Sequence, residues 1–164
     1  MADADATGTV RGRLVGIYVT PQRGAAMQSP GNVFAVEGKG LDGDRYAAGT
    51  GTFSGHDGPG RQVTLIEREA VAAAVADTGV QLAEHETRRN LVTAGVTLLD
   101  LVDRTFRIGD VVLCGVRSCP PCAYLDQRTR PGVRNALEDR GGLRADIVRG
   151  GALTVGDEIV ILPG

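Results

Sequence analysis

The sequence predicts a mainly β protein, a β-barrel with a few short helices. Short runs rich in β-branched residues recur along the chain, and the 24 glycines are scattered without a period, which fits many short strands joined by tight turns. A length of 164 residues with 42% hydrophobic residues is enough for one domain with its own core. We expect residues 1–9 to form a flexible N-terminal tail and residues 10–164 to form the single domain.

The N-terminal part of the chain is expected to alternate strands with polar loops. Residues 10–20 alternate in polarity and predict a first strand, which the polar loop 21–30 separates from a short strand at 33–36. The run Asp42-Gly43-Asp44 is a turn signature. Residues 49–60 hold five glycines, so a glycine-rich loop of the kind that often covers sites is expected there.

The middle of the chain brings the expected helices. Residues 63–66 predict a buried strand, and residues 67–76 predict an alanine-rich helix with acidic residues at its start and a stop near Gly79. Residues 84–91 predict a second, polar helix, and the apolar run 97–101 predicts a strand.

The C-terminal part is expected to close the barrel. The elements expected here are strands at 105–108, 111–116, 143–148 and 158–162, a short helix from Ala123 and another at 133–139. Gly109-Asp110, Gly150-Gly151 and Gly156-Asp157 predict turns between strands. The whole chain then has eight strands, mostly antiparallel.

Composition excludes several classes of function. The net charge is -2 and aromatics are 4%, so no nucleic-acid partner is expected. No apolar run approaches the ~20 residues that a membrane helix needs, so no membrane partner is expected either. The N-terminus lacks the basic and apolar regions of a secretion signal, which predicts a cytoplasmic protein whose cysteines stay reduced.

The basic residues are almost all arginine, since Lys39 is the only lysine among 18 basic residues. Arginine suits bidentate recognition of phosphate or carboxylate groups. Codon bias in a GC-rich genome explains most of these arginines, so only those near other candidate residues count toward a site.

Cys119-Pro120-Pro121-Cys122 is the strongest candidate for chemistry. The segment follows an apolar strand and precedes a short helix, so two thiols lie at a strand-to-helix junction, where backbone N–H groups and nearby arginines favour a thiolate. Such a thiolate binds a soft metal, carries sulfur or acts as a nucleophile. The ordinary alternative is a buried, inert cysteine, which is also our interpretation of Cys114 in the preceding strand.

Two other uses of a cysteine pair fit less well. A structural zinc site needs four N or S ligands, and only Cys114, His56 and His85 remain to complete one, so zinc is not expected. A thioredoxin-like redox pair expects a βαβ pattern around it. His56, in the glycine-rich loop, is a candidate general base, although a lone histidine in a loop is most often exposed to solvent and has no catalytic role.

Short motifs spread along the chain match those of a known family in order and spacing. They are Gly40-Leu41-Asp42-Gly43-Asp44-Arg45, Arg61-Gln62-Val63-Thr64-Leu65-Ile66, Arg88-Arg89-Asn90-Leu91-Val92-Thr93-Ala94-Gly95-Val96, Phe106-Arg107-Ile108-Gly109-Asp110, the cysteine pair, Gly141-Gly142-Leu143-Arg144-Ala145 and Val155-Gly156-Asp157. Together they resemble a stand-alone MOSC domain, named for the C-terminal domain of molybdenum cofactor sulfurase, over roughly residues 10–162.

The resemblance implies a MOSC-type β-barrel that handles the molybdenum cofactor or activated sulfur through a reactive cysteine. Cys122, which a hydrophobic residue follows, best matches the cysteine that ligates molybdenum in relatives, and Cys119 matches a less uniform partner position. The family is also associated with pyridoxal phosphate. Only Lys39 could form its Schiff base, and this lysine lies between glycines in an expected loop, so pyridoxal phosphate is not expected here.

Five polar residues near the motifs are expected to form an anion pocket for a pterin phosphate or an oxoanion. They are Arg45, Arg61, Arg89, Asn90 and Arg144, of which Arg144 is a weaker candidate, as is a further arginine, Arg117. Asp44 could orient Arg45, whereas Arg88 is interpreted as solvated charge. Gly141-Gly142 either makes a turn or lets backbone N–H groups approach a ligand.

These features predict a MOSC-domain protein that binds a small anionic or sulfur-bearing ligand. Its reactive cysteine favours an enzyme of sulfur transfer or of chemistry linked to the molybdenum cofactor. Cys122 would ligate molybdenum or carry sulfur, with Cys119 as a second catalytic candidate. One alternative is a metal-free enzyme with a cysteine nucleophile, of C–S lyase or hydrolase type. Another is a non-catalytic carrier that delivers cofactor or sulfur to a partner enzyme.

Overall fold

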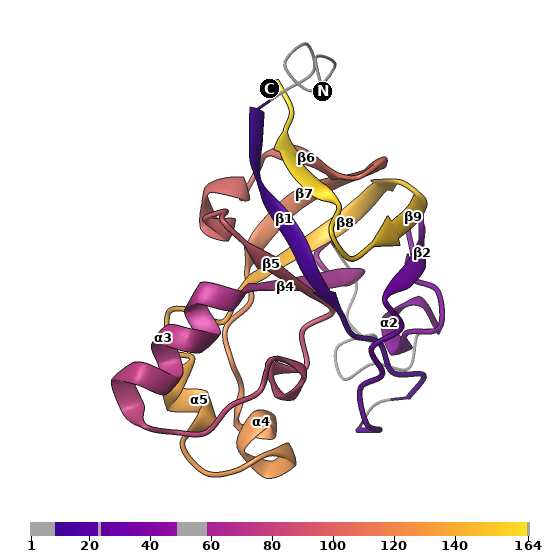
Figure 1. The fold of residues 1–164 in the computed structure, drawn as a ribbon. Coiled ribbons are helices and arrows are strands. Elements are labelled where there is room, and N and C mark those ends of the chain that lie inside the picture. Colours follow the sequence, from indigo (N-terminus) through magenta and orange to yellow (C-terminus); the bar gives the residue numbers. More distant parts are fainter. Residues whose placement is uncertain (1–8, 23, 49–58, 164) are drawn as a thin grey trace.

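The computed structural model shows a closed barrel of seven strands (Figure 1). It describes residues 9–22, 24–48 and 59–163. Around the barrel the strands follow the order β1 (Thr9–Ile17), β10 (Glu158–Ile161), β6 (Thr105–Ile108), β7 (Val111–Ser118), β8 (Leu143–Arg149), β4 (Val63–Glu67) and β5 (Leu91–Ala94). Neighbouring strands run antiparallel, except that β4 and β5 are parallel. The prediction of a β-barrel is confirmed.

A smaller sheet and short helices surround the barrel. The sheet has the order β3 (Gly40–Leu41), β2 (Asn32–Val36) and β9 (Gly151–Thr154). The helices are α2 (Arg45–Ala48), α3 (Arg68–Thr78), α4 (Ala123–Arg128) and α5 (Val133–Ala136), with 3-10 turns η1 (Glu84–Thr87) and η2 (Leu98–Leu101). The expected tail lies outside the described residues, apart from Thr9, which begins β1. His56 and most of its glycine-rich loop also lie outside them.

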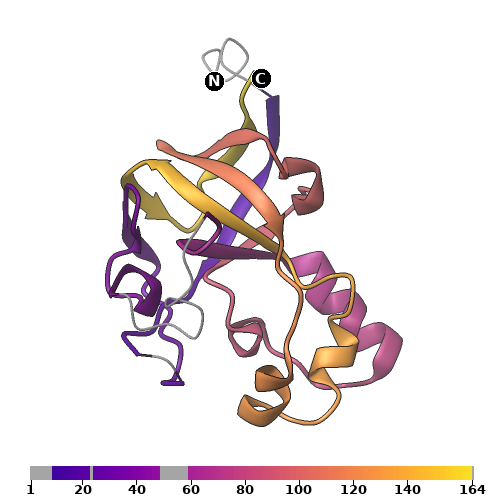
Figure 2. The same cartoon turned by 180° about the vertical axis from the view of Figure 1, so that it is seen from behind.

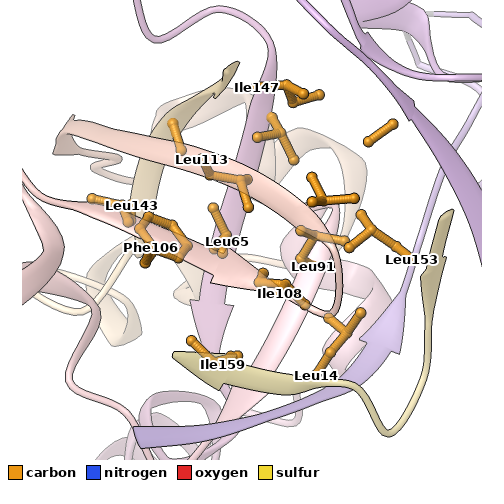
Figure 3. Close-up of a cluster of buried hydrophobic side chains, with 14 of the residues drawn as sticks. Leu14, Leu65, Leu91, Phe106, Ile108, Leu113, Leu143, Ile147, Leu153 and Ile159 are labelled. Carbon is orange, nitrogen blue, oxygen red and sulfur yellow. The ribbon is translucent and has the colours of Figure 1, made fainter. Parts of the chain in front are cut away.

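The barrel interior is filled by side chains. Leu14, Leu65, Leu91, Phe106 and Ile159 point into it from five strands and are fully buried (Figure 3). Burying each such side chain stabilises the fold by roughly 1.5–3 kcal/mol. The interior is therefore a packed core, and ligands must bind outside it.

A second apolar cluster lies between the barrel and its helices. Ile66 of β4 and Val92 of β5 face outward and pack with residues of α3 and α5, among them Ala74 and Val133. Because Leu91 faces the barrel core while Val92 faces the helices, β5 is buried on both sides. A strand of this kind shows an uninterrupted apolar run rather than alternation.

Several sequence predictions of secondary structure are wrong, and the described residues form ten strands rather than the eight expected. The polar helix expected at 84–91 stops at Thr87, because Arg88 adopts a left-handed conformation with φ 60° before β5 starts. The strand expected at 97–101 is the 3-10 turn η2, whose buried residues Leu98 and Leu101 have helical spacing. The expected turn at Gly150-Gly151 is shorter, since Gly151 already starts β9, which pairs with β2.

The topology gathers several loops at one end of the barrel. In Figures 1 and 2, η1, α2 and α4 lie toward the end opposite to the start of β1 and the end of β10. The segment between β7 and α4, which contains the cysteine pair, runs toward the same end (Figure 2). Among the described helices, none is long and apolar enough to cross a membrane.

Gly142 is fixed by close packing of β8 against β4. Its φ of +108° suits glycine, and an added Cβ would collide with the carbonyl oxygen of Leu65. We therefore expect Gly142→Ala to lower the free energy of unfolding by about 2–3 kcal/mol, measured by urea denaturation. Gly43→Ala is the matched control, because Gly43 also has positive φ (+84°) but open space around it. It should cost about 1 kcal/mol, and equal losses would contradict the packing argument.

Candidate functional site

The cysteine segment, residues 119–122, leads from β7 into α4. Cys122 is the N-cap of α4 in an extended conformation, with φ −122° and ψ 167°, and it is half-buried. Cys119 is only 1% exposed, and its backbone N–H donates to the carbonyl oxygen of Gly142 at 2.8 Å. All three cysteines are free thiols. Cys122 is thus the more accessible thiol of the pair.

Arg89 holds the cysteine segment in place. Its side chain is buried, and its Nε donates to the carbonyl oxygen of Gly141 at 2.8 Å. Its Nη2 donates to the carbonyl oxygens of Cys119 at 2.9 Å and Pro120 at 3.3 Å. These bonds tie the segment after η1 to the segment that carries both thiols. The geometry gives Arg89 a positioning role beside any role toward a ligand.

A small cavity of about 30 Å³ lies beside Cys122. Its walls come from three separate parts of the chain: α2, the residues between η1 and β5, and the start of α4. The lining residues are Arg45, Tyr46, Arg88, Arg89, Cys122, Tyr124 and Leu125. The structure thus brings two arginines of the predicted anion pocket, Arg45 and Arg89, to the predicted reactive cysteine. A thiol among guanidinium groups is suited to an anionic ligand that has a soft or electrophilic atom.

Asp44 orients Arg45, as the sequence analysis suggested. Its buried carboxylate accepts hydrogen bonds from Arg45 Nη1 and from the backbone N–H of Thr20, both at 3.1 Å. Arg45 Nη2 donates to the carbonyl oxygen of Arg88 at 3.2 Å, and the guanidinium lies over the Tyr46 ring, 4.5 Å from its centroid. The position of this positive charge is therefore fixed before any ligand binds.

Arg88 is the charged residue of this cavity that the sequence did not predict; Tyr46, Tyr124 and Leu125 also line it and were not predicted. Arg88 was interpreted as solvated charge, but only 8% of it is exposed, because the left-handed backbone at this position ends η1 and the side chain turns inward. Its Nη1 donates to the carbonyl oxygen of Ala25 at 2.9 Å. Burial and then the nearby positive charge of Arg45 lower the pKa of Arg88. A non-glycine residue in this conformation leaves no clear sequence signal, although its place in a family motif was a hint.

Arg61 and Arg144 belong to a neighbouring cluster with Arg117. Arg144 is buried and donates to the carbonyl oxygen of Gly60 at 3.4 Å, and Arg117 donates to that of Pro59 at 2.9 Å. Burial, followed by the charges of Arg117 and Arg144, lowers the pKa of Arg61. The cavity beside Cys122 is not lined by these three arginines. Tyr46 lies near both clusters, since it acts electrostatically on Arg61 and on Arg88.

Asn90 is fully buried just before β5, and its amide connects β4 with the residue that follows β1. Its Oδ1 accepts from the backbone N–H and the hydroxyl of Thr64, at 3.0 and 3.2 Å, and its Nδ2 donates to the carbonyl oxygen of Tyr18 at 3.2 Å. The structure therefore places Asn90 behind the site, where it fixes the backbone that leads from Arg89 into β5.

Cys119 contributes to the wall of a different and larger cavity. This cavity measures about 440 Å³ and lies between η2, the start of α3 and the residues after α5. Three of its lining residues, Cys119, Pro120 and Gly141, are those whose carbonyl oxygens accept hydrogen bonds from Arg89. The two thiols of the pair therefore border different cavities.

Other candidate groups lie away from the cavity beside Cys122. Lys39 is exposed in the turn between β2 and β3. Within the described part of the chain, no group of three or more His, Cys, Asp or Glu side chains could hold a metal ion. Cys114 was expected to be buried but is only half-buried on β7, and its thiol donates to the carbonyl oxygen of Gly115 at 3.6 Å.

Comparisons with known proteins agree with this architecture. A family model described as the MOSC domain matches residues 52–160. The YuaD protein from Bacillus subtilis has a similar structure, with a TM-score of 0.77 and 17% identity over 93% of this chain and 97% of that one. YiiM from Escherichia coli gives a TM-score of 0.66 and 19% identity over 93% and 70% of the two chains. At such identities these likenesses show the fold alone. No curated protein sequence matches the chain.

Proposed function

Because the chain belongs to the MOSC domain family, which is associated with molybdenum cofactor binding and sulfur transfer, we propose that it binds a molybdenum-pterin or sulfur-bearing anion beside Cys122. Cys122 is the reactive group of this proposal, and Arg45, Arg88 and Arg89 attract the anionic part of the ligand. The observation that carries the proposal is the cavity that joins a half-buried free thiol with these arginines.

The donor set suits both ligands. A cysteine thiolate is a soft ligand of the kind that transition metals accept, and guanidinium groups match phosphate oxygens. Molybdenum, when bound, would supply the redox and atom-transfer chemistry. The chain's own residues would bind the anion, orient it and hold the thiol toward it. The cavity of about 30 Å³ is far below the roughly 300–1,000 Å³ of a pocket that encloses a whole drug-sized ligand. It therefore suits one end of a larger ligand or a small sulfur-bearing anion.

The remaining predicted residues have supporting roles in this proposal. Asn90 positions Arg89 through its bonds to Thr64 and Tyr18. Arg61 and Arg144 add positive charge at a neighbouring position and would attract a second anionic group of a larger ligand. The backbone of Cys119 is held by hydrogen bonds to Gly142 and Arg89. In this proposal Cys119 therefore positions Cys122 and does not react itself.

The small volume beside Cys122 also favours a second candidate, an enzyme that uses a cysteine nucleophile without metal. In this candidate a small acyl or C–S substrate places its reactive end at the thiol, and its one negative group meets Arg45. In a third possibility the protein is a carrier, and a partner enzyme receives the cofactor or the sulfur from Cys122.

Purification under anaerobic conditions, followed by elemental analysis and intact-mass spectrometry, tests the proposal. We expect either molybdenum together with a pterin, or a protein whose mass exceeds the sequence mass by one sulfur atom located on Cys122. If the protein has neither, and yet turns over a small thiol-reactive substrate, the metal-free enzyme replaces the main proposal. If Cys122 is unmodified and unreactive in all these assays, the thiol is structural.

A further inference from the structure

We propose that Arg88, together with Arg45 and Arg128, forms a subsite for a tetrahedral oxoanion group, a phosphate ester or a sulfur oxoanion, between the cavity at Cys122 and a second cavity next to it. The inference rests on the proposed function, because it names the part of the ligand that these residues recognise. It adds Arg88 and Arg128, which the sequence analysis did not place in the site.

The first observation is a hydrogen-bond donor without an acceptor. Arg88 is buried, and its Nη2 is shielded from solvent yet has no hydrogen-bond partner among the residues that the structure describes. Leaving a charged donor buried without an acceptor costs more than leaving a neutral one. An acceptor supplied by a ligand would remove this cost.

The second observation is an excess of positive charge. Arg45 and Arg128 lie close enough to act electrostatically on Arg88, and both lower its pKa. Of the nearby carboxylates, Asp44 is bound to Arg45. Glu86 is bound to Arg130 through both of its oxygens, at 3.1 and 2.7 Å. Neither carboxylate is thus available to Arg88, and an oxoanion with two negative charges would relieve the repulsion among the three guanidinium groups.

The third observation is the shape of the space around Arg88. Besides the small cavity at Cys122, Arg88 lines a cavity of about 250 Å³, whose other walls include Met27, His85 and Arg128. The left-handed backbone of Arg88, the bond from Arg45 to its carbonyl oxygen and the bond from its Nη1 to Ala25 fix its position. A ligand with its reactive atom at Cys122 and its oxoanion at Arg88 would extend into this second cavity.

Isothermal titration of the intact protein with inorganic phosphate and with thiosulfate tests the subsite. We expect saturable binding of at least one anion, and a loss of about tenfold or more in affinity for Arg88→Gln. Arg88→Lys should recover only part of it, because an ammonium group lacks the planar fork of donors. Tighter binding of phosphate would identify a phosphate ester as the ligand group, and tighter binding of thiosulfate a sulfur oxoanion.

Arg149→Gln is the control, since Arg149 is exposed on β8 and donates to the carbonyl oxygen of Asp110. Arg128→Gln, at an exposed position, keeps the test valid should Arg88 variants fail to fold, and it should weaken binding about two- to fivefold. Absence of saturable binding, equal losses at Arg149, or unchanged binding in both Arg88→Gln and Arg128→Gln would overturn the subsite. Protein that lacks molybdenum and persulfide but shows Arg88-dependent binding would overturn the proposed function alone.

Discussion

Serine at position 122 should abolish retention of molybdenum or of a sulfur atom, and with it any activity, while the barrel remains folded. Serine is nearly the same size as cysteine but is a far weaker nucleophile and a poor ligand for soft metals. Cys122 is half-buried at the edge of a cavity and makes no side-chain capping bond to α4, so little stability depends on it. Elemental analysis and intact-mass spectrometry of Cys122→Ser, with circular dichroism as the check on folding, provide the measurement.

Cys114→Ser is the matched control for this experiment. Cys114 lies on β7 among barrel strands, so its replacement should leave ligand retention unchanged. Cys119→Ser should be intermediate: it puts a hydroxyl into a buried position and shifts the segment that positions Cys122. A Cys122→Ser protein with full molybdenum or persulfide content would show that the assignment of the reactive cysteine is wrong.

The sequence predicts a barrel strand well where one face of the strand lies in the core and the other is partly in solvent. β6 shows this directly, with Phe106 and Ile108 buried and Thr105 and Arg107 half-buried. β5 could not be recognised in the same way, since Leu91 and Val92 are both buried between the core and the helices. β9 begins at a glycine with φ 157° and depends on pairing with β2, which local sequence does not encode.

For the candidate site, residue type could be predicted better than residue contacts. The motifs point to Cys122, Arg45 and Arg89, and the structure brings all three to one cavity. The different roles of Arg88 and Arg89 could not be predicted, because they depend on tertiary contacts. Both line the cavity, but Arg89 donates to three backbone carbonyls, whereas Nη2 of the left-handed residue Arg88 has no partner among the described residues. Tertiary contacts of this kind decide which arginine in a motif holds the fold and which is available to a ligand.

The hydrogen bonds from Arg89 to the cysteine segment and Gly141 predict a large loss of stability when Arg89 is replaced. Arg89→Ala removes a buried side chain that donates to the carbonyl oxygens of Gly141, Cys119 and Pro120. The substitution leaves these acceptors without a donor and creates a void in place of the side chain. Together these effects should lower the free energy of unfolding by roughly 3–5 kcal/mol. The same loss would release the cysteine segment, so anion binding should fall even where the protein remains folded. Urea denaturation measures the first effect, and titration with phosphate at low temperature measures the second.

Arg68→Ala is the control that distinguishes the loss of the buried hydrogen bonds of Arg89 from the loss of a positive charge. Arg68 forms its ion pair with Glu84 near the surface, where about half of its side chain is exposed. Pairs of this kind contribute at most about 1 kcal/mol, because water and salt screen them. Arg89→Lys adds a second distinction, since a lysine keeps the charge but cannot reach three carbonyl oxygens with a planar fork, and it should restore only a fraction of the stability. If Arg89→Ala proves no more destabilising than Arg68→Ala, the cysteine segment must be held by its other bond, from Cys119 to Gly142, and the positioning role of Arg89 is wrong.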